Sequence, residues 1–233
     1  MKVVILAGGL GTRISEYTKT IPKPMIKICG KPIIQRIIDH YYSYGHREFY
    51  IALGYKGKVI RDYFNNKKKN KKIRIHLIDT GKNTMTGGRL KRLKKFLNET
   101  FLLTYGDGLS DIDLNKLQSL HQRNNNLVTL SGVFPPPRFG GLKISGNQIE
   151  SFIEKPANEV SRVNGGFMIC NKNIFNYLTN DEQSFEIDVL PLLAMNNQLG
   201  CFKHNGFWQP MDTLRDKKLL QRIWDEGQAL WKN

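Results

Sequence analysis

The beginning of the chain constrains the fold more than any other segment. A short run of apolar, mostly β-branched residues at 3–6 leads directly into the glycine cluster between Gly8 and Gly11. The run predicts a buried first strand, and the glycines predict a loop whose backbone N–H groups can approach an anion, because no Cβ stands in the way. Arg13 and Lys23, the latter between two prolines, add two cations at the same place. Together these features predict a phosphate-binding loop.

The spacing of the glycines differs from two familiar phosphate-binding patterns. A dinucleotide fingerprint needs G-x-G-x-x-G, and a P-loop needs G-x-x-x-x-G-K-[ST]. This chain instead reads Gly-Gly-x-Gly-Thr-Arg between Gly8 and Arg13. A bare turn between a strand and a helix would not require the arginine and the lysine together. We therefore interpret the loop as a nucleotide site outside those two classes.

Strand-like and helix-like segments alternate along the chain. Strand-like segments lie at 3–6, 49–53, 73–77, 101–103 and 201–204, and helix-like segments lie at 32–44, 59–64, 90–97, 114–120, 185–193 and 213–227. This alternation is typical of parallel strands joined by crossover helices. We therefore predict an α/β fold, a Rossmann-like mixed, mainly parallel sheet flanked by helices. The length of 233 residues favours a single domain.

The formal net charge of +16 makes a nucleic-acid-binding protein the competing class. The basicity is local, because residues 67–95 contain twelve Lys or Arg and one acidic residue, Asp79. This stretch has no interleaved aromatic residues and matches no recognised DNA- or RNA-binding motif. We interpret the lysine-rich part, 67–72, as a solvated loop that attracts anionic substrates, and we expect no nucleic-acid partner.

Other sequence features exclude further classes of protein. No apolar run is long enough to span a bilayer and no signal peptide is evident, so we expect a cytoplasmic protein without a membrane partner. Cys29, Cys170 and Cys201 are widely spaced and odd in number, which indicates neither a disulfide framework nor a zinc site. We expect Cys170 and Cys201 to lie in the core. The five histidines show no paired metal-ligand spacing.

Further motifs extend over nearly the whole chain. They are TGKNTMTGGRLKR at 80–92, YGDG at 105–108, FG at 139–140, EKP at 154–156, NGGF at 164–167 and GFWQPMDTLRDK at 206–217. With the first loop, they make the chain resemble the glucose-1-phosphate cytidylyltransferases, which are sugar-phosphate nucleotidyltransferases. The chain is a shortened variant, because the segment near 65–72 is longer in that family. The motif at 80–92 favours cytosine, since thymidylyl and uridylyl relatives carry a glutamine- and proline-containing sequence there.

The resemblance implies Mg²⁺-dependent transfer of a cytidylyl group from CTP to a phosphorylated small-molecule acceptor, with release of pyrophosphate. Glucose 1-phosphate is the first choice of acceptor, and the pathway would be the synthesis of precursors for surface polysaccharide or capsule. The segments near 65–72 and at 184–190 depart from the family pattern, so two alternatives stay open. These are another sugar 1-phosphate and a non-sugar phosphate such as L-glutamine phosphate. A homo-oligomer is also implied.

The resemblance assigns Lys23, Arg13 and Asp107 to catalysis. Lys23 would lie near the α-phosphate and Arg13 nearest the leaving pyrophosphate. The implied nucleotide-binding residues are Leu6, Ala7, Gly8, Gly9, Gly11, Thr12, Arg13, Lys23, Thr84, Arg89 and Gly106. Thr84 and Arg89 correspond to the residues that contact the base and ribose. Taken alone, Arg89 would be interpreted as a surface charge at the start of a cationic helix.

Two aspartates are the expected magnesium ligands. Mg²⁺ typically takes one or two protein carboxylates together with substrate phosphates, and Asp107 and Asp212 lie in family motifs. Asp107 should also lie at the ligand crevice, because it follows a predicted strand. Asp212 has an alternative role as the N-terminal cap of the helix expected to begin near Thr213.

The acceptor is expected in the second half of the chain. The domain would divide into a nucleotide half, about 1–125, and an acceptor half, about 126–233. We interpret the strand-like segments at 127–134, 142–144, 148–152 and 166–169 as a small β extension that closes over the acceptor. The resemblance implies that Lys155 contacts the acceptor phosphate and Glu154 its hydroxyls, with Asn164 and the Gly140 backbone completing the pocket.

Overall fold

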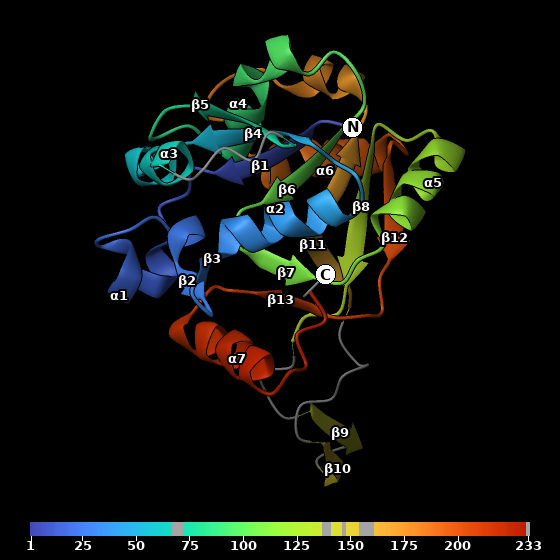
Figure 1. The fold of residues 1–233 in the computed structure, drawn as a ribbon. Helices are drawn as coiled ribbons and strands as arrows, with labels where there is room; N and C mark the ends of the chain where they lie inside the picture. Colours follow the sequence, from blue (N-terminus) through green and yellow to red (C-terminus); the bar gives the residue numbers. More distant parts are fainter. Residues whose placement is uncertain (67–71, 137–140, 146–147, 154–160, 232–233) are drawn as a thin grey trace.

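The chain forms a central sheet with helices on both faces (Figure 1). The structure is a computed structural model that describes residues 1–66, 72–136, 141–145, 148–153 and 161–231. Within these residues the sheet has seven strands, in the spatial order β12 (Leu199–Lys203), β8 (Val128–Val133), β11 (Val163–Cys170), β6 (Phe101–Tyr105), β1 (Val3–Ala7), β4 (Glu48–Leu53) and β5 (Arg74–Asp79).

The sheet is mixed and mainly parallel, which confirms the predicted fold class. Strands β5, β4, β1 and β6 are parallel neighbours, and β12 is parallel to β8. Strand β11 alone among these seven runs the other way, because it pairs antiparallel with both β6 and β8.

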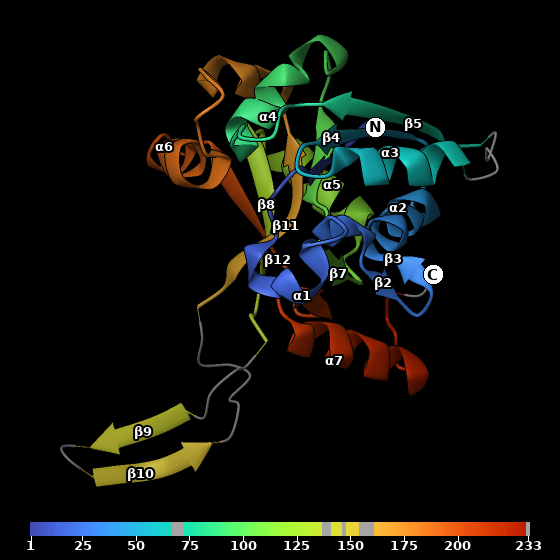
Figure 2. The same ribbon diagram turned by 90° about the vertical axis from the view of Figure 1, so that its left-hand side faces the viewer.

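Two of the four segments expected to form the β extension extend the central sheet itself. Strands β8 and β11 pair with each other in this sheet, and β11 also pairs with β6. The other two segments form the hairpin of β9 (Gly141–Ser145) and β10 (Gln148–Ile153), which stands apart from the central sheet in Figure 2.

Strand β1 is buried on both faces of the sheet. All five of its residues are buried, as expected for a strand covered by helices on either side. Because successive side chains point to opposite faces, Val3 and Ile5 join one hydrophobic core while Val4 and Leu6 join the other. This explains why the sequence here is a continuous apolar run rather than an alternating one.

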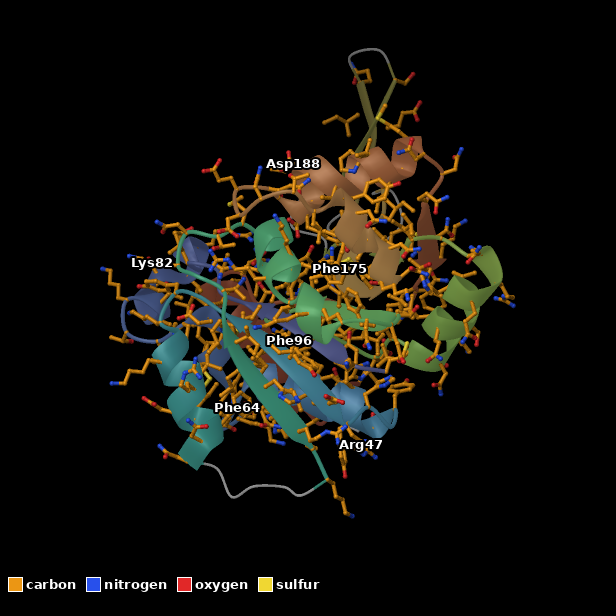
Figure 3. All side chains as sticks on the ribbon, turned by 90° about the horizontal axis from the view of Figure 1, so that it is seen from above. Arg47, Phe64, Lys82, Phe96, Phe175 and Asp188 are labelled. Atoms are coloured by element: carbon orange, nitrogen blue, oxygen red, sulfur yellow. The ribbon has the colours of Figure 1, made fainter. Side chains whose placement is uncertain are left out.

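Helices with apolar stripes cover the two faces. The core that contains Val3 is covered by α2 (Ile33–Ser43), α3 (Gly57–Asn66), α5 (Leu114–Asn124) and α7 (Leu214–Asp225). The core that contains Val4 is covered by α4 (Thr86–Arg92), the π-helical turn η5 (Phe185–Val189) and α6 (Leu190–Met195). Pro191 does not break this last region, because it lies in the first turn of α6. Figure 3 shows Phe175 in the interior and Lys82 at the periphery.

Short elements complete the fold. They are η1 (Thr12–Ile14), α1 (Ser15–Thr18), η2 (Lys23–Met25), β2 (Lys27–Ile28), β3 (Lys31–Pro32), η3 (Lys94–Phe96), β7 (Gly108–Ser110), η4 (Lys172–Tyr177) and β13 (Trp208–Pro210). None of the helices in the described residues is both long and apolar enough to cross a bilayer.

The two cysteines expected in the core differ. Cys170 is fully buried at the end of β11, as predicted. Cys201 is exposed, so that expectation was wrong. The reason is its position on β12, the edge strand of the sheet, where alternate side chains point to solvent.

Candidate active site

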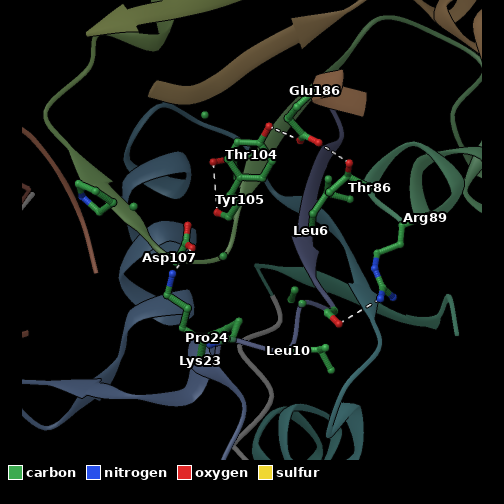
Figure 4. A pocket seen from close by; sticks show the side chains of 18 of the residues that line it. Leu6, Leu10, Lys23, Pro24, Thr86, Arg89, Thr104, Tyr105, Asp107 and Glu186 are labelled. Atoms are coloured by element: carbon green, nitrogen blue, oxygen red, sulfur yellow. Dashed lines mark hydrogen bonds and ion pairs between the residues drawn. The ribbon is translucent and has the colours of Figure 1, made fainter. Parts of the chain in front are cut away.

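The predicted ligand loops converge at the carboxyl ends of β1 and β6, which are neighbours in the sheet. A cleft of about 890 Å³ opens there, and Figure 4 shows part of its lining. The turn after β6 lies against β1, since the Gly106 N–H donates to the Leu6 carbonyl at 3.1 Å. Ligands of open α/β sheets bind at this edge, so the cleft is the candidate active site.

The cleft brings together most of the residues predicted from the sequence. Its lining includes Leu6, Ala7, Gly8, Gly9, Gly11, Thr12, Arg13, Lys23, Thr84, Arg89, Gly106, Asp107, Asn164 and Asp212. Gly140, Glu154 and Lys155 lie outside the described residues, so their roles stay predictions. Trp208 also lines the cleft, and its Nε1–H donates to the Gly165 carbonyl at 2.7 Å.

Lys23 is the centre of an ionic cluster. Its Nζ lies 2.6 Å from Asp107 Oδ2 and 2.6 Å from Asp212 Oδ1. Arg13 reaches the other oxygen of Asp212 at 2.7 Å. The side chain of Lys23 is buried, whereas that of Arg13 is mostly exposed. Two cations and two carboxylates therefore meet at one point of the cleft.

Burial and charge act in opposite directions on Lys23. Burial by itself lowers its pKa, but the charges and hydrogen bonds of Asp107 and then Asp212 outweigh burial, so the pKa of Lys23 is raised above its ordinary value. The ammonium therefore stays protonated at neutral pH. It is a full positive charge that can contact a phosphate.

A small antiparallel pairing brings the two aspartates together. Strand β7 follows Asp107, β13 precedes Asp212, and the two strands pair with Pro210 opposite Gly108. The N–H of Met211 also donates to the Asp107 carbonyl at 2.9 Å. Residues from the middle and the end of the sequence thereby reach the same lysine.

Asp212 is not the cap of the last helix, so that alternative was wrong. Thr213 is the N-cap of α7 and forms a capping box with Asp216, in which each side chain accepts a hydrogen bond from the other's backbone N–H. The Asp212 side chain instead bonds Lys23 and Arg13. Its carboxylate is therefore directed into the cleft.

The donor set fits a magnesium ion. Among the described residues, no group of three or more His, Cys, Asp or Glu side chains is arranged to hold a metal. Asp107 and Asp212 each approach Lys23 Nζ at 2.6 Å, so their bonded oxygens lie within twice that distance of one another. Mg²⁺ needs only one or two carboxylates because waters and substrate phosphates supply the remaining ligands. The two aspartates satisfy that requirement.

The glycine loop requires glycine for a specific reason. Gly11 has a φ of +66°, and an added Cβ would lie 2.8 Å from Thr18 Cγ2. The Thr18 hydroxyl donates to the Gly11 carbonyl at 3.0 Å, which fixes the loop in this left-handed conformation. A side chain at this position would be strained, and the loop would lose its close contact with α1.

Arg89 is buried rather than exposed, so its interpretation as a surface charge was wrong. Its exposed fraction is 4%. The guanidinium donates to the Thr80 hydroxyl and to backbone carbonyls of Leu53, Gly8, Gly81 and Lys82. Arg89 therefore joins the loops after β1, β4 and β5 at the wall of the cleft. Its predicted contact with the nucleotide stays a prediction.

Sequence reasoning missed a hydrogen-bonded group on another wall of the cleft. Glu186 in η5 accepts from the hydroxyls of Tyr105 and Thr86, as Figure 4 shows. Burial, and next the charge of Glu186, raise the pKa of Tyr105 well above its ordinary value, so its hydroxyl stays a donor. The departure of segment 184–190 from the family pattern was the only signal that pointed here.

The basic segment is partly neutralised within the fold. Arg74 pairs with Glu48 at 2.8 Å, and Arg92 pairs with Asp181. Arg89, as described above, is buried. Of these three cations, two therefore have an acidic partner and the third is removed from the surface.

Comparison with known proteins identifies the class. A model of the nucleotidyl transferase family matches residues 2–217. The chain therefore belongs to the nucleotidyl transferase family, and it is an enzyme of this type. Along its full length it is similar to glucose-1-phosphate cytidylyltransferase of Salmonella typhi, with 43% identity over 254 residues that cover 100% of this chain and 99% of the relative. This similarity confirms the resemblance found in the motifs.

Other relatives act on different substrates. The chain is 34% identical over 189 residues to D-glycero-alpha-D-manno-heptose 1-phosphate guanylyltransferase of Campylobacter jejuni, with 80% of this chain and 83% of the relative covered. Among solved structures, HddC from Yersinia pseudotuberculosis complexed with GMP-PN matches with a TM-score of 0.76 and 27% identity, over 96% of this chain and 99% of that one. The fold is therefore shared by enzymes of differing specificity.

Proposed function

We propose that the chain is a Mg²⁺-dependent cytidylyltransferase that converts CTP and glucose 1-phosphate to CDP-glucose and pyrophosphate. The product would enter the synthesis of surface polysaccharide, and we expect a cytoplasmic homo-oligomer. The observation that carries the proposal is the cluster of Lys23, Asp107 and Asp212 in the cleft. The full-length similarity to glucose-1-phosphate cytidylyltransferases supports the choice of substrates.

The reaction is an attack by an acceptor phosphate oxygen on the α-phosphorus of CTP. A new P–O bond forms, the bond from the α-phosphorus to the bridging oxygen breaks, and its electron pair leaves with pyrophosphate. The protein forms no covalent bond with either substrate. Its residues must hold two polyanions together and stabilise the charge that develops on the phosphoryl oxygens.

Each charged group would have a separate task. Asp107 and Asp212 would hold a magnesium ion, which when bound supplies positive charge to the triphosphate oxygens. Lys23, protonated at neutral pH, would exchange its carboxylate contacts for the α-phosphate. Arg13 is exposed beside Asp212 and would contact the leaving pyrophosphate. The backbone N–H groups of the glycine loop would bind the remaining phosphate oxygens.

A pyrophosphate-release assay of the purified protein with Mg²⁺ tests the proposal. CTP, UTP, dTTP, GTP and ATP are each combined with glucose 1-phosphate, mannose 1-phosphate and L-glutamine phosphate. We expect turnover with CTP and glucose 1-phosphate, and its loss in Asp107→Asn, whose fold should be retained. Turnover with CTP and a different acceptor would correct the substrate only. If no nucleotide raises the melting temperature while short RNA binds in a salt-dependent manner, the enzyme proposal fails.

A further inference from the structure

We propose that Thr86, which lies in the motif predicted to bind the nucleotide, is a positioning residue for the opposite wall of the cleft. This wall is formed by Glu186, Tyr105 and Asn164, and we expect it to face the acceptor. The proposal rests on the proposed function, because it concerns the second substrate of the same site. It differs from the assignments above, since Thr86 acts through Glu186 and Tyr105 rather than on a substrate.

The hydroxyl of Thr86 makes two hydrogen bonds to η5. It accepts from the backbone N–H of Phe185 at 2.9 Å, and it donates to Glu186 Oε2. Thr86 and Glu186 are 100 positions apart in the sequence, so their contact joins the nucleotide half of the chain to the acceptor half. One hydroxyl thus holds both the backbone and the carboxylate of η5.

Backbone hydrogen bonds also hold the start of α4 against the segment that leads into η5. Met85 N–H donates to the Asp181 carbonyl at 2.8 Å, and Gly87 N–H donates to the Gln183 carbonyl at 3.0 Å. A Cβ on Gly87 would lie 2.7 Å from that Gln183 oxygen, and glycine therefore permits this close approach. The start of α4 and the segment that carries Glu186 are thereby held in direct contact.

The carboxylate of Glu186 connects Thr86 to Tyr105 and, through Tyr105, to Asn164, which is predicted to bind the acceptor. Its Oε1 accepts from Tyr105, whose hydroxyl in turn accepts from Asn164 Nδ2 at 3.4 Å. Asn164 is held from its other end, because its Oδ1 accepts from Gly166 N–H at 2.9 Å. Thr86, Glu186, Tyr105 and Asn164 all line the cleft. A continuous chain of hydrogen bonds therefore connects the loop predicted to bind the nucleotide with the side chain predicted to bind the acceptor.

Loss of the Thr86 hydroxyl should therefore affect binding of the two substrates differently. If Thr86 loses its hydroxyl, Glu186 Oε2 keeps only Ser184 Oγ as a donor, at 3.1 Å. The carboxylate, and with it the wall formed with Tyr105 and Asn164, is then held less firmly. Arg89, which is predicted to contact the nucleotide, keeps its hydrogen bonds to the Thr80 hydroxyl and to the loop carbonyls. We therefore expect the acceptor to be bound less well while CTP binding is retained.

The test compares Thr86→Val, which keeps the shape but removes the hydroxyl, with Thr86→Ser, which keeps the hydroxyl. We expect Thr86→Val to raise the KM of the acceptor about tenfold or more, which corresponds to loss of a hydrogen bond to a charged group. The KM of CTP should change less than about twofold, and Thr86→Ser should restore the acceptor KM. Equal changes in both KM values, or no rescue by serine, would overturn the proposal.

Two further variants keep the proposal testable if Thr86→Val folds poorly. Tyr105→Phe removes the hydrogen bond to Oε1, the other carboxylate oxygen of Glu186, and should raise the acceptor KM in the same way. In a double-mutant cycle, the combined effect of Thr86→Val and Glu186→Gln on the acceptor KM should be smaller than the sum of the two single effects, because the two side chains share one hydrogen bond. Additive effects would overturn the proposal. Absence of wild-type turnover with every substrate pair would instead count against the proposed function.

Discussion

Asp212 and Thr213, which are adjacent at the start of α7, should have different roles, one in activity and the other in stability. Asp212 directs its carboxylate to Lys23 and Arg13, whereas Thr213 caps the helix together with Asp216. We therefore predict that Asp212→Asn loses activity with little loss of stability, and that Thr213→Ala loses stability with little loss of activity. The two substitutions are matched, because they are neighbours in the same turn.

The magnitudes follow from the contacts that each substitution removes. Thr213→Ala abolishes an N-cap, which costs about 1 kcal/mol and lowers the Tm of a domain of this size by about 2–4 °C. Its turnover should stay within about twofold of the wild type. Asp212→Asn removes a proposed magnesium ligand and the charge opposite Lys23. Loss of several kcal/mol of transition-state stabilisation would lower turnover by about a hundredfold or more.

The assay pairs thermal unfolding with pyrophosphate release on the same preparations. Lys23 keeps Asp107 as its partner in Asp212→Asn, so the fold should survive. The reasoning is refuted if Asp212→Asn retains turnover but unfolds at the lower temperature expected of the cap variant. It is also refuted if Thr213→Ala loses activity as strongly as Asp212→Asn.

Two further predictions concern the stability of the fold, one at the buried His40 and one at the glycine loop of the cleft. Burial lowers the pKa of His40 to about 4, so the folded protein binds fewer protons here than the unfolded chain, whose histidine pKa is about 6.5. The free energy of unfolding should therefore fall as the pH drops from 6.5 towards 4. His40 should account for about 2 kcal/mol of this fall between pH 7 and 5, and His40→Gln should remove that contribution from the pH dependence. At the cleft, a Cβ on Gly8 would lie 2.3 Å from Arg89 Cζ, whereas one on Gly9 would meet nothing within 4 Å. Gly8→Ala should cost about 1–3 kcal/mol of folding free energy and Gly9→Ala less than about 0.5 kcal/mol.

Chemical denaturation across a pH series checks the first of these predictions, and thermal or urea unfolding at pH 7 checks the second. An unchanged pH slope in His40→Gln would show that the histidine does not titrate as expected from its burial. Equal stability of Gly8→Ala and Gly9→Ala would show that the Arg89 guanidinium moves aside without cost.

Local patterns in the sequence were sufficient for the elements and for much of the cleft. The apolar run of β1 and the glycines that follow it predicted a buried strand and a loop, because a continuous apolar run and the backbone freedom of glycine are local properties of the sequence. The leucine spacing at Leu114 and Leu117 likewise identified α5. Since parallel strands end at one edge of a sheet, the placement of Asp107 beside the glycine loop followed as well.

Contacts between distant segments decided the rest. The spacing around Asp212 could not show whether its carboxylate caps the helix or is directed into the cleft, because that depends on Lys23, 189 residues away. The insertion of β11 between β6 and β8 and the edge position of β12, which exposes Cys201, are properties of strand pairing rather than of either strand.

The wall formed by Glu186 is the clearest case of this kind. A glutamate in a helical segment is ordinarily exposed, and nothing in its immediate sequence indicates that Thr86 and Tyr105 will donate to it. Only the folded chain brings α4, β6 and η5 together at the cleft. Tertiary structure therefore determines which polar groups line this wall of the cleft, because burial and hydrogen bonding depend on which residues become neighbours in space.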